Sequence, residues 1–523
     1  MFLRPFALAA LAGALWFLSC ADFDVWPLAW FAMVPTLFVI ERAETTRRAF
    51  VLAWITGVVA NGGGFYWIIG LLVRFGHLPW IVSALLFALL AAYQGLVFAM
   101  FGAVTRVIRR RTRLPMAVVA PLVIVTFELV TPMIFPFSLA ITQAWRPHVI
   151  QVADLAGMSA VAALLLMVNG AVYDLVLVRP RRVLPALASA GTLGAALIYG
   201  QWRIAQVDRE RAAAPHLEVG VVQSNLSFDM KGENRSAFAK RQSRDLQEQS
   251  RLLEAEGAEL VIWPETAFPY AIPRAAGGDA DAGNPRRVRA GFTVPVLFGA
   301  LSFEAKTSTA QARARIWNTA FLLDRAGTFA GRSDKIHRMP FSEYVPGRDR
   351  FAFIDRMMPS TTAQYERGRV VGTFDFTAAD GRVWKLGPMI CYEDILEGFG
   401  RELAAQHPNL LVNITNDAWF GDTSEPWQHL ALSVFSAVEL RTDLVRAVNT
   451  GVSAYVDAAG RVYAKTYAVN PVAHPTGADR LHARVAMLDG GHTVYASVGN
   501  LFAYLCAALT ALLWLAKRRV RRA

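Results

Sequence analysis

Cysteine is scarce in this sequence: Cys20, Cys391 and Cys506 are the only three in 523 residues. Cys20 and Cys506 lie in or beside long apolar runs, so Cys391 has no cysteine partner between residues 203 and 495. This excludes a disulfide framework for that stretch. A lone cysteine is either a small buried hydrophobe or a residue that the chemistry requires, and the count alone leaves both interpretations open.

Spaced metal ligands are absent as well. Neither His337 nor His429 belongs to a pattern such as HExxH, so we expect structural or surface roles for both. The sequence also has no internal repeat and no low-complexity tail. We therefore expect no metal and no cofactor.

Long hydrophobic runs, by contrast, are abundant. The hydrophobic content is 54%, above the roughly 45–50% of ordinary globular proteins. The excess lies in runs with few charges, each near the length of about 20 residues that crosses a bilayer as a helix. We predict eight transmembrane helices, at residues 6–21, 25–40, 49–70, 79–105, 115–137, 155–178, 183–202 and 496–516. The expected domains are residues 1–202 with seven helices, 203–495, and 496–523 with the eighth helix and a basic tail.

The net charge of +12 comes from alternate loops between these runs. The basic residues are Arg4, Arg42, Arg47, Arg48, Arg106, Arg109, Arg110, Arg111, Arg113, Arg179, Arg181, Arg182, Lys517, Arg518, Arg519, Arg521 and Arg522. Cytoplasmic loops carry such an excess, so we expect both termini in the cytoplasm and residues 203–495 exported. The overall positive charge is then explained by membrane topology, so it no longer indicates nucleic-acid binding. A signal peptide ending at Cys20 is a less favoured alternative, because further runs with consistent charge alternation follow.

A few polar residues lie inside the apolar runs, namely Glu128, Asn61, Gln94, Asn169 and Asp174. An ionisable residue at membrane depth costs at least roughly 2.5 kcal/mol unless it meets a partner or water. Glu128 therefore indicates either a packed interior or lipid-headgroup site, or a structural hydrogen bond between helices.

The stretch from 203 to 495 is typical of one α/β domain. Short runs rich in Val, Ile and Leu predict strands that are buried on both faces. They begin near residues 216, 258, 293, 315, 386, 409 and 445. Helical spacing begins near residues 234 and 426, and residues 274–285 form a loop rich in Gly, Asp and Pro.

Three reactive side chains follow predicted strands: Glu265, Lys335 and Cys391. Ligand chemistry usually gathers at the carboxyl ends of strands, so we expect the three to converge. Glu265 is a candidate base for the thiol proton, and Lys335 a candidate to offset nearby acids, keep a thiolate accessible and bind an oxyanion. The backbone N–H of Tyr392, at an expected helix N-terminus, is a candidate second oxyanion donor.

Five ordered segments, WPETAFP, KIHRMPFSEYVP, MICYEDI, NITNDAWFG and RAVNTGVSAYVD, resemble the motif series of the nitrilase (carbon-nitrogen hydrolase) superfamily. Together with the eight apolar runs, they resemble the bacterial apolipoprotein N-acyltransferase family in particular, over nearly the whole chain.

The resemblance implies an αββα sandwich for the exported domain and a Glu-Lys-Cys triad of Glu265, Lys335 and Cys391. Glu343 and Glu393 match further acids of the family's site. It also implies a multi-pass protein of the bacterial inner membrane, expected as a monomer, with a periplasmic catalytic domain. The implied reaction passes an acyl chain from a phospholipid, typically phosphatidylethanolamine, to the cysteine, and then to the α-amino group of a diacylglyceryl-cysteine on an apolipoprotein.

Two segments are candidate lipid contacts: residues 351–365, rich in Phe and Met, and residues 417–427, which include Trp419. Ordinary core packing is the alternative for both. The loop SFDMKGEN departs from the family, because it lacks a tryptophan that is often found there.

Two other functions remain open at this point. A membrane-tethered hydrolase with the same triad differs only in admitting water instead of an amine. A transporter with an exported accessory domain is suggested by Glu128, but it leaves the three reactive residues without a purpose.

Overall fold

The computed structural model describes residues 4–178, 183–226, 234–305, 314–340, 342–345, 347, 364–466 and 478–516. The chain divides into two compact units. The first comprises Met1–Asp208, Thr423–Glu439 and Thr493–Ala523, and the second comprises Arg209–Asp422 and Leu440–His492. The basic segments at 179–182 and 517–522, most of segment 351–365 and most of the loop SFDMKGEN lie outside the described residues.

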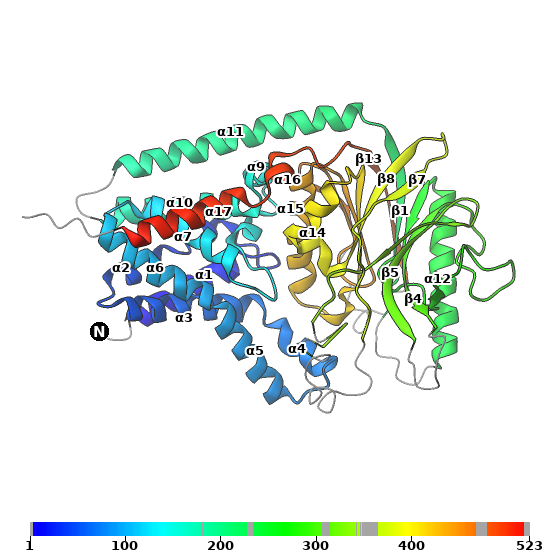
Figure 1. Ribbon diagram of the computed structural model, residues 1–523, viewed down its shortest axis with the longest axis horizontal. Helices are drawn as coiled ribbons and strands as arrows, with labels where there is room; N and C mark the ends of the chain where they lie inside the picture. Colours follow the sequence, from blue (N-terminus) through cyan, green and yellow to red (C-terminus); the bar gives the residue numbers. More distant parts are fainter. Residues whose placement is uncertain are drawn as a thin grey trace, which may run out of the picture. The chain divides into compact units, whose positions relative to one another are not determined.

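The first unit is a helical bundle (Figure 1). Its longer helices are α1 (Arg4–Leu18), α2 (Val34–Arg42), α3 (Thr46–Gly64), α4 (Trp67–Arg74), α5 (Trp80–Gln94), α6 (Leu96–Thr112), α7 (Met116–Val130), α10 (Met158–Val176), α11 (Val183–Ala213), α15 (Glu425–Leu440) and α17 (Leu501–Leu515). Short elements connect them: η1 (Trp26–Trp30), η2 (Leu139–Gln143), α8 (Pro147–Ile150), α9 (Ala153–Ala156) and α16 (Val494–Val498). α11 continues past the boundary that the sequence predicts at residue 202.

Fewer helices reach the length of a membrane span than the sequence predicts. Within the described ranges, three helical stretches are long and apolar enough to cross a membrane. They are Trp80–Thr112, which takes α5 and α6 together, Met158–Val176 and Val183–Ala213. α3 and α4 form a fourth if they count as one span, although they meet at a bend of 56°. The helices Arg4–Leu18, Met116–Val130 and Leu501–Leu515 are apolar but shorter.

The predicted continuous helix at 25–40 is wrong. The chain there forms the five-residue η1 and, after a break, the nine-residue α2. Each begins with a proline in its first turn, where the missing N–H costs nothing. Pro35 would interrupt the hydrogen-bond ladder of one continuous helix, so the segment starts again at that residue.

Two of the polar residues in the apolar runs join separate backbone segments of this unit. Asn169 accepts a hydrogen bond from the N–H of Met33 at 2.9 Å and donates to the carbonyl of Ala29 at 2.9 Å. Asp174 accepts from the N–H of Ala117 at 3.0 Å, at the start of α7. Asn169 and Asp174 are fully buried and satisfy backbone groups that have no partner within a helix.

The remaining polar residues also make internal hydrogen bonds. Gln94 donates to the Oδ1 of Asn61 at 2.8 Å and accepts from the N–H of Phe135 at 3.1 Å. Glu128 accepts from the hydroxyl of Ser138 at 3.2 Å, across the turn that follows α7. The structure thus favours the structural hydrogen bond over a transport or headgroup site for these side chains.

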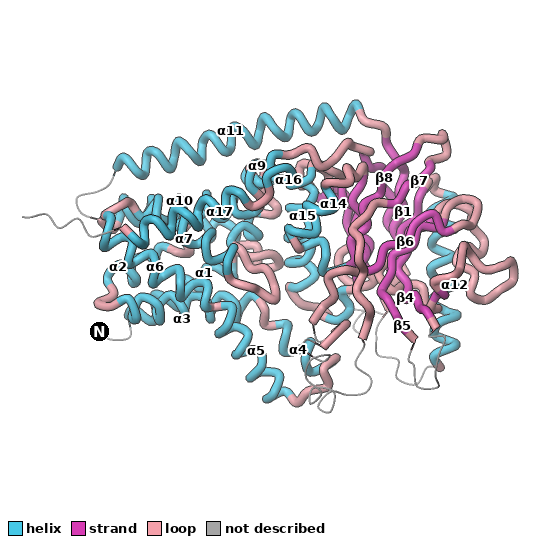
Figure 2. The backbone as a smooth tube through the Cα atoms, viewed as in Figure 1, coloured by secondary structure: helices cyan, strands magenta, loops and turns pink. Residues whose placement is uncertain are grey.

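The second unit contains two β-sheets, drawn in magenta in Figure 2. The first has the strand order β13-β1-β2-β4-β5-β6, with β3 also paired to β4. The second has the order β12-β11-β10-β9-β8-β7. The strands are β1 (His216–Gln223), β2 (Leu260–Ile262), β3 (Ile272–Pro273), β4 (Val296–Glu304), β5 (Arg315–Leu323), β6 (Phe329–Asp334), β7 (Phe374–Thr377), β8 (Val383–Ile390), β9 (Leu410–Thr415), β10 (Leu444–Val448), β11 (Ala454–Val456), β12 (Val462–Lys465) and β13 (Asp479–Ala486).

One apolar core joins the two sheets face to face. It takes Leu217 and Leu297 from the first sheet and Ile390 and Val412 from the second. A second apolar cluster covers the opposite face of the first sheet with α12 (Arg235–Ala255), which runs along that sheet in Figure 2. On the second sheet, the side chain of Leu403 from α14 (Glu397–Ala404) packs against β8. The predicted α/β sandwich is therefore present.

Candidate active site

Three loops at strand ends carry the predicted reactive residues. Glu265 follows β2, Lys335 directly follows β6, and Cys391 directly follows β8. β2 and β6 belong to the first sheet, whereas β8 belongs to the second. The site is therefore assembled from both layers of the sandwich, as sequence position alone suggested for strand ends.

Lys335 forms ion pairs with two glutamates. Its Nζ lies 3.0 Å from the Oε1 of Glu265 and 3.0 Å from the Oε2 of Glu343. Asn318 of β5 donates through Nδ2 to Glu265 at 2.7 Å and to Glu343 at 2.9 Å. Lys335 is only 2% exposed, so the ammonium is held in place away from water.

Cys391 lies in a strained backbone conformation. Its φ is +52°, in the left-handed region that non-glycine residues rarely adopt. It begins the five-residue 3-10 helix η3 (Cys391–Ile395), and Asn413 of β9 donates through Nδ2 to its carbonyl at 3.3 Å. The residue as a whole is half-buried at this sharp turn.

The two acids beside the cysteine point to other partners. The carboxylate of Glu393 accepts hydrogen bonds from the N–H groups of Ile336 at 2.6 Å, His337 at 3.1 Å and Ile390 at 2.9 Å. Because Ile336 follows Lys335 and Ile390 precedes Cys391, Glu393 ties the lysine loop to the cysteine strand. Burial raises the pKa of Glu393 to about 7, against the opposing effect of these hydrogen bonds.

The second of these acids, Asp394, belongs to a buried ionic network that the sequence reading missed. The guanidinium of Arg446 in β10 forms two ion pairs, from Nη1 to the Oδ2 of Asp394 and from Nη2 to the Oδ2 of Asp417, each at 2.9 Å. Its Nη1 also donates to the Oδ1 of Asn413 at 3.0 Å. Arg446 is fully buried. An arginine in an otherwise apolar strand was the signal that could have revealed the network. Since Asn413 also holds the carbonyl of Cys391, the network supports the strained turn.

Burial raises the pKa of the Cys391 thiol well above its usual value, and the charge of Glu265 raises it further. Lys335 lowers it but is outweighed. The raised pKa favours the neutral thiol before substrate binds, and the role of Lys335 in keeping a thiolate accessible stays a prediction. For Lys335 itself, burial lowers the pKa, but Glu265 and Glu343 more than compensate, so it stays charged.

Glu265 remains the candidate base for the thiol proton, and its charge acts on the Cys391 thiol. Burial raises its pKa, Lys335 opposes that rise, and Glu343 adds to it. A carboxylate with a raised pKa is a stronger base than an exposed one. The site thus pairs a neutral thiol with a tuned base and a fixed cation.

The other predicted residues belong to several separate segments of the chain. Tyr392 follows the cysteine and is partly exposed, and burial raises the pKa of its phenol to about 12. Trp419 is partly exposed in η4 (Asp417–Trp419), directly after β9. The ring of His337 packs edge-on against Phe399, with ring centroids 5.8 Å apart. His429 lies in α15 of the first unit, 3.7 Å from Glu425.

Comparison with known proteins agrees with this architecture. Residues 12–171 match the apolipoprotein N-acyltransferase N-terminal domain, and residues 219–470 match the carbon-nitrogen hydrolase family. The apolipoprotein N-acyltransferase of Geobacter metallireducens is 31% identical over 97% of this chain and 94% of its own length. That of Bdellovibrio bacteriovorus is 30% identical over 88% of this chain and 85% of its own. With both domains and nearly the full length matched, the chain belongs to the apolipoprotein N-acyltransferase family.

Proposed function

We propose that this protein transfers a fatty acyl chain from a phospholipid, with phosphatidylethanolamine the expected donor, to the α-amino group of the N-terminal diacylglyceryl-cysteine of lipoproteins. The observation that carries the proposal is the buried Lys335, held 3.0 Å from both Glu265 and Glu343, acting on the thiol of Cys391. Family membership supplies the substrate class, and the geometry supports the chemistry.

In the first half-reaction, Glu265 takes the proton from Sγ of Cys391 as the sulfur attacks the ester carbonyl of the phospholipid. Lys335 Nζ and the backbone N–H of Tyr392 stabilise the oxyanion that forms. The carbon–oxygen bond of the ester then breaks, and Glu265 returns the proton to the departing alkoxide of the lysophospholipid. The product is a thioester on Cys391.

In the second half-reaction, the amine of the diacylated acceptor attacks the thioester carbonyl. Glu265 removes a proton from the amine, the carbon–sulfur bond breaks, and the proton returns to the thiol. Because one site serves both lipids in turn, the two bulky substrates need not bind together. A thioester keeps enough activation for an amine to attack. Glu343 and Glu393 position the lysine and cysteine loops, and Trp419 is proposed to contact lipid.

The membrane arrangement belongs to the same proposal: a multi-pass enzyme of a bacterial inner membrane, both termini cytoplasmic, residues 203–495 periplasmic, and a monomeric state. Contacts within the helical unit support a shared side for the basic loops. Arg109 lies 3.2 Å from Glu41, and the guanidinium of Arg111 lies 5.8 Å from the ring of Trp514 near the end of α17. The loops after the second and fourth expected spans and the end of the eighth thus meet.

Intact-protein mass spectrometry tests the proposal. Full-length protein in detergent, incubated with phosphatidylethanolamine, should gain the mass of one fatty acyl group and lose it when a diacylated lipopeptide is added. Cys391→Ser should abolish the gain. The matched control Cys506→Ser should keep it, since Cys506 lies buried in α17. Release of free fatty acid without N-acylated peptide would contradict the transferase and point to a hydrolase.

A further inference from the structure

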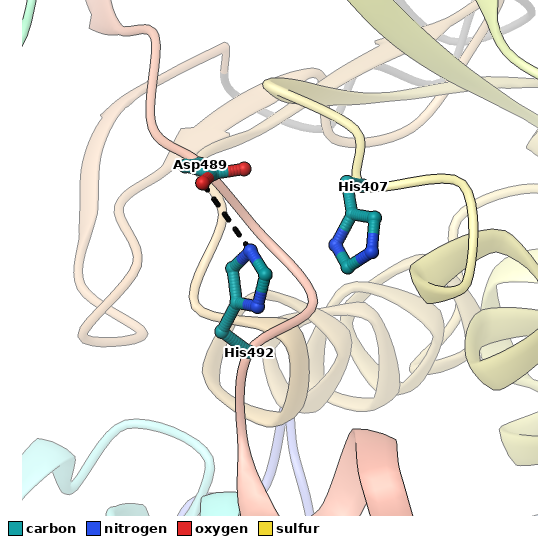
Figure 3. A group of neighbouring side chains, drawn as sticks. All are labelled: His407, Asp489 and His492. Carbon is teal, nitrogen blue, oxygen red and sulfur yellow. Dashed lines mark ion pairs between the residues drawn. The ribbon is translucent and has the colours of Figure 1, made fainter.

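Three side chains outside the active site form a compact cluster on the second unit: His407, Asp489 and His492 (Figure 3). Each offers one potential metal-ligand atom, and these atoms lie within 4.8 Å of one another. All three residues are exposed, so an ion from solution can reach them. None of them takes part in the proposed acyl transfer, and the inference below does not depend on it.

Two chain segments far apart in the sequence bring these residues together. His407 lies in the turn after α14, with its N–H donating to the carbonyl of Ala404 at 2.9 Å. Asp489 and His492 lie in the loop between β13 and α16. Asn409 clamps the two segments, because its Nδ2 donates to the carbonyl of Leu488 at 2.8 Å and its own carbonyl accepts from Leu488 at 3.3 Å.

Close packing fixes the loop against its neighbours. A Cβ on Gly490 would lie 1.8 Å from the Oγ1 of Thr442, and one on Gly491 would lie 2.5 Å from the carbonyl oxygen of Ala404. Gly491 also has a φ of +85°, which favours glycine. His407 adopts a φ of +51°, a conformation that costs a non-glycine residue free energy. The cluster therefore rests on a closely packed backbone scaffold.

The spacing of Asp489 and His492 suits a shared ion. The Nε2 of His492 lies 3.2 Å from the Oδ2 of Asp489. Two ligands of a tetrahedral zinc ion, each about 2.0–2.1 Å from the metal, lie about 3.3 Å apart. This pair is thus already at ligand spacing, and only His407 has to rotate toward it to complete a three-residue set.

The environment of His407 favours a ligand role. Its Nδ1 lies 3.3 Å from the carbonyl oxygen of Gly490, so the Nδ1–H tautomer satisfies that carbonyl and leaves the lone pair on Nε2. Histidines that bind metals usually make such a bond with their other ring nitrogen. The His407 and His492 rings stack with centroids 4.5 Å apart and an angle of 18° between their planes. The two rings are therefore direct neighbours, and a rotation of the His407 ring is what turns its Nε2 lone pair toward an ion held by Asp489 and His492.

We propose that His407, Asp489 and His492 bind a divalent transition-metal ion, with zinc the first candidate and water completing the coordination. Two imidazoles and one carboxylate suit zinc, copper or nickel, whereas magnesium and calcium prefer oxygen ligands. The bound ion links the turn after α14 to the segment that leads from β13 to α16. Since the unfolded chain lacks this site, binding stabilises the fold.

Calorimetric titration with zinc chloride tests the proposal on full-length protein in detergent, without a polyhistidine tag and stripped with a chelator. All titrations use the Cys391→Ser background, because an active-site thiolate is itself a zinc ligand. We expect one equivalent to bind. His407→Ala and His492→Ala should each weaken binding at least about tenfold, since losing even an outer partner costs about 10- to 100-fold. Magnesium chloride should not compete.

His482→Ala is the matched control, because His482 lies beside a single carboxylate, 3.3 Å from Glu218. It should bind zinc like the parent. Without metal, each variant should fold and melt close to the parent, because His407 and His492 are exposed and His482 is partly exposed. Zinc should raise the melting temperature of the parent and of His482→Ala only. Absence of a bound equivalent in the parent, or undiminished binding in both cluster variants, would overturn the proposal.

Discussion

Cys391 combines a strained backbone, a protonated thiol and a fixed ammonium nearby, and each part has a separate physical cause. The left-handed φ comes from the turn between β8 and η3. The raised thiol pKa comes first from burial and then from Glu265. The charge on Lys335 survives burial because Glu265 and Glu343 flank it. We therefore expect activation of the sulfur to coincide with proton transfer to Glu265 rather than to precede it.

This requirement makes Glu265→Gln the sharpest test of the proposed base. The amide keeps the size of the side chain and one acceptor oxygen for Asn318 and Lys335, but it cannot accept the thiol proton. We expect thioester formation to slow at least about 100-fold, followed by intact-protein mass against time. Glu304→Gln, an exposed carboxylate at the end of β4, should leave the rate unchanged. Equal rates for the Glu265 variant and the parent would remove Glu265 from this role.

Arg446 is expected to position the cysteine turn and not to react itself. Arg446→Met leaves Asp394 and Asp417 buried without their shared cation, which should destabilise the fold by about 3–5 kcal/mol. Arg446→Lys keeps one charge and should fold, with a lower melting temperature and a slower acylation rate at unchanged affinity for the donor.

Thermal melting and acylation kinetics check this prediction. Arg382→Ala is the control, because Arg382 pairs with Asp380 at the surface and such pairs contribute about 1 kcal/mol or less. If Arg446→Met melts like Arg382→Ala, the buried network does not support the site.

Some of these residues could be identified from the sequence and others could not, for a physical reason. Glu265 and Cys391 each follow an apolar run, and Lys335 follows a predicted strand and turn, so a reactive side chain at a strand end was the signal for all three. Asn318 and Arg446 lie inside strands, where the sequence pattern shows only a polar residue within an apolar run. Their roles depend on partners in other strands, which only the folded arrangement provides.

At the scale of single elements, β4 determines how closely the Glu265 loop can approach the first sheet. A Cβ on Gly299 would lie 2.5 Å from the N of Thr266 and 2.7 Å from both the Cα of Glu265 and the carbonyl oxygen of Pro264. These contacts are backbone atoms, so the loop has to move. Gly299→Ala should cost about 1–3 kcal/mol of stability. It should also slow acylation at least about tenfold, because small displacements of a reactive group reduce rates strongly.

Melting curves and acylation rates of this variant test the prediction. Gly277→Ala is the matched control, since a Cβ at that position meets open space and the residue has no positive φ. The control should match the parent in both measurements. If Gly299→Ala also matches it, the approach of the loop to β4 does not set the position of Glu265.

Central strands were easier to predict than edge strands. β1, β9 and β10 are buried nearly throughout, and their apolar runs predicted them. β12 alternates between half-buried and exposed residues, and β13 is mostly half-buried; both were missed. A strand with one solvent-exposed face contains fewer apolar residues, so its sequence indicates a strand less clearly. Its pairing partner is set by tertiary structure. The run near 445 also contains two strands, β10 and β11, separated by a turn that the sequence reading did not divide.

At the scale of the whole molecule, the distribution of hydrophobic and basic residues is the main determinant of membrane orientation. The apolar runs predict spans, but breaks at Pro35 and between α3 and α4 divide some of them. Breaks of this kind depend on packing within the bundle. Hydropathy therefore indicates a membrane domain more reliably than it counts helices.

Membrane orientation is a separate question from the number of helices, and the distribution of Lys and Arg among the loops is what predicts it. Within the helical unit, Arg109 pairs with Glu41, and Arg111 lies against Trp514, so the ends of α2, α6 and α17 lie at one end of the bundle. From the positive-inside rule we expect that end to lie in the cytoplasm. A reporter that fluoresces only in the cytoplasm should therefore be fluorescent when fused after residue 523. An enzyme reporter that works only after export should be active when inserted in the loop at 274–285. An inverted pair of signals would contradict the orientation and would place Cys391 on the side opposite to that proposed.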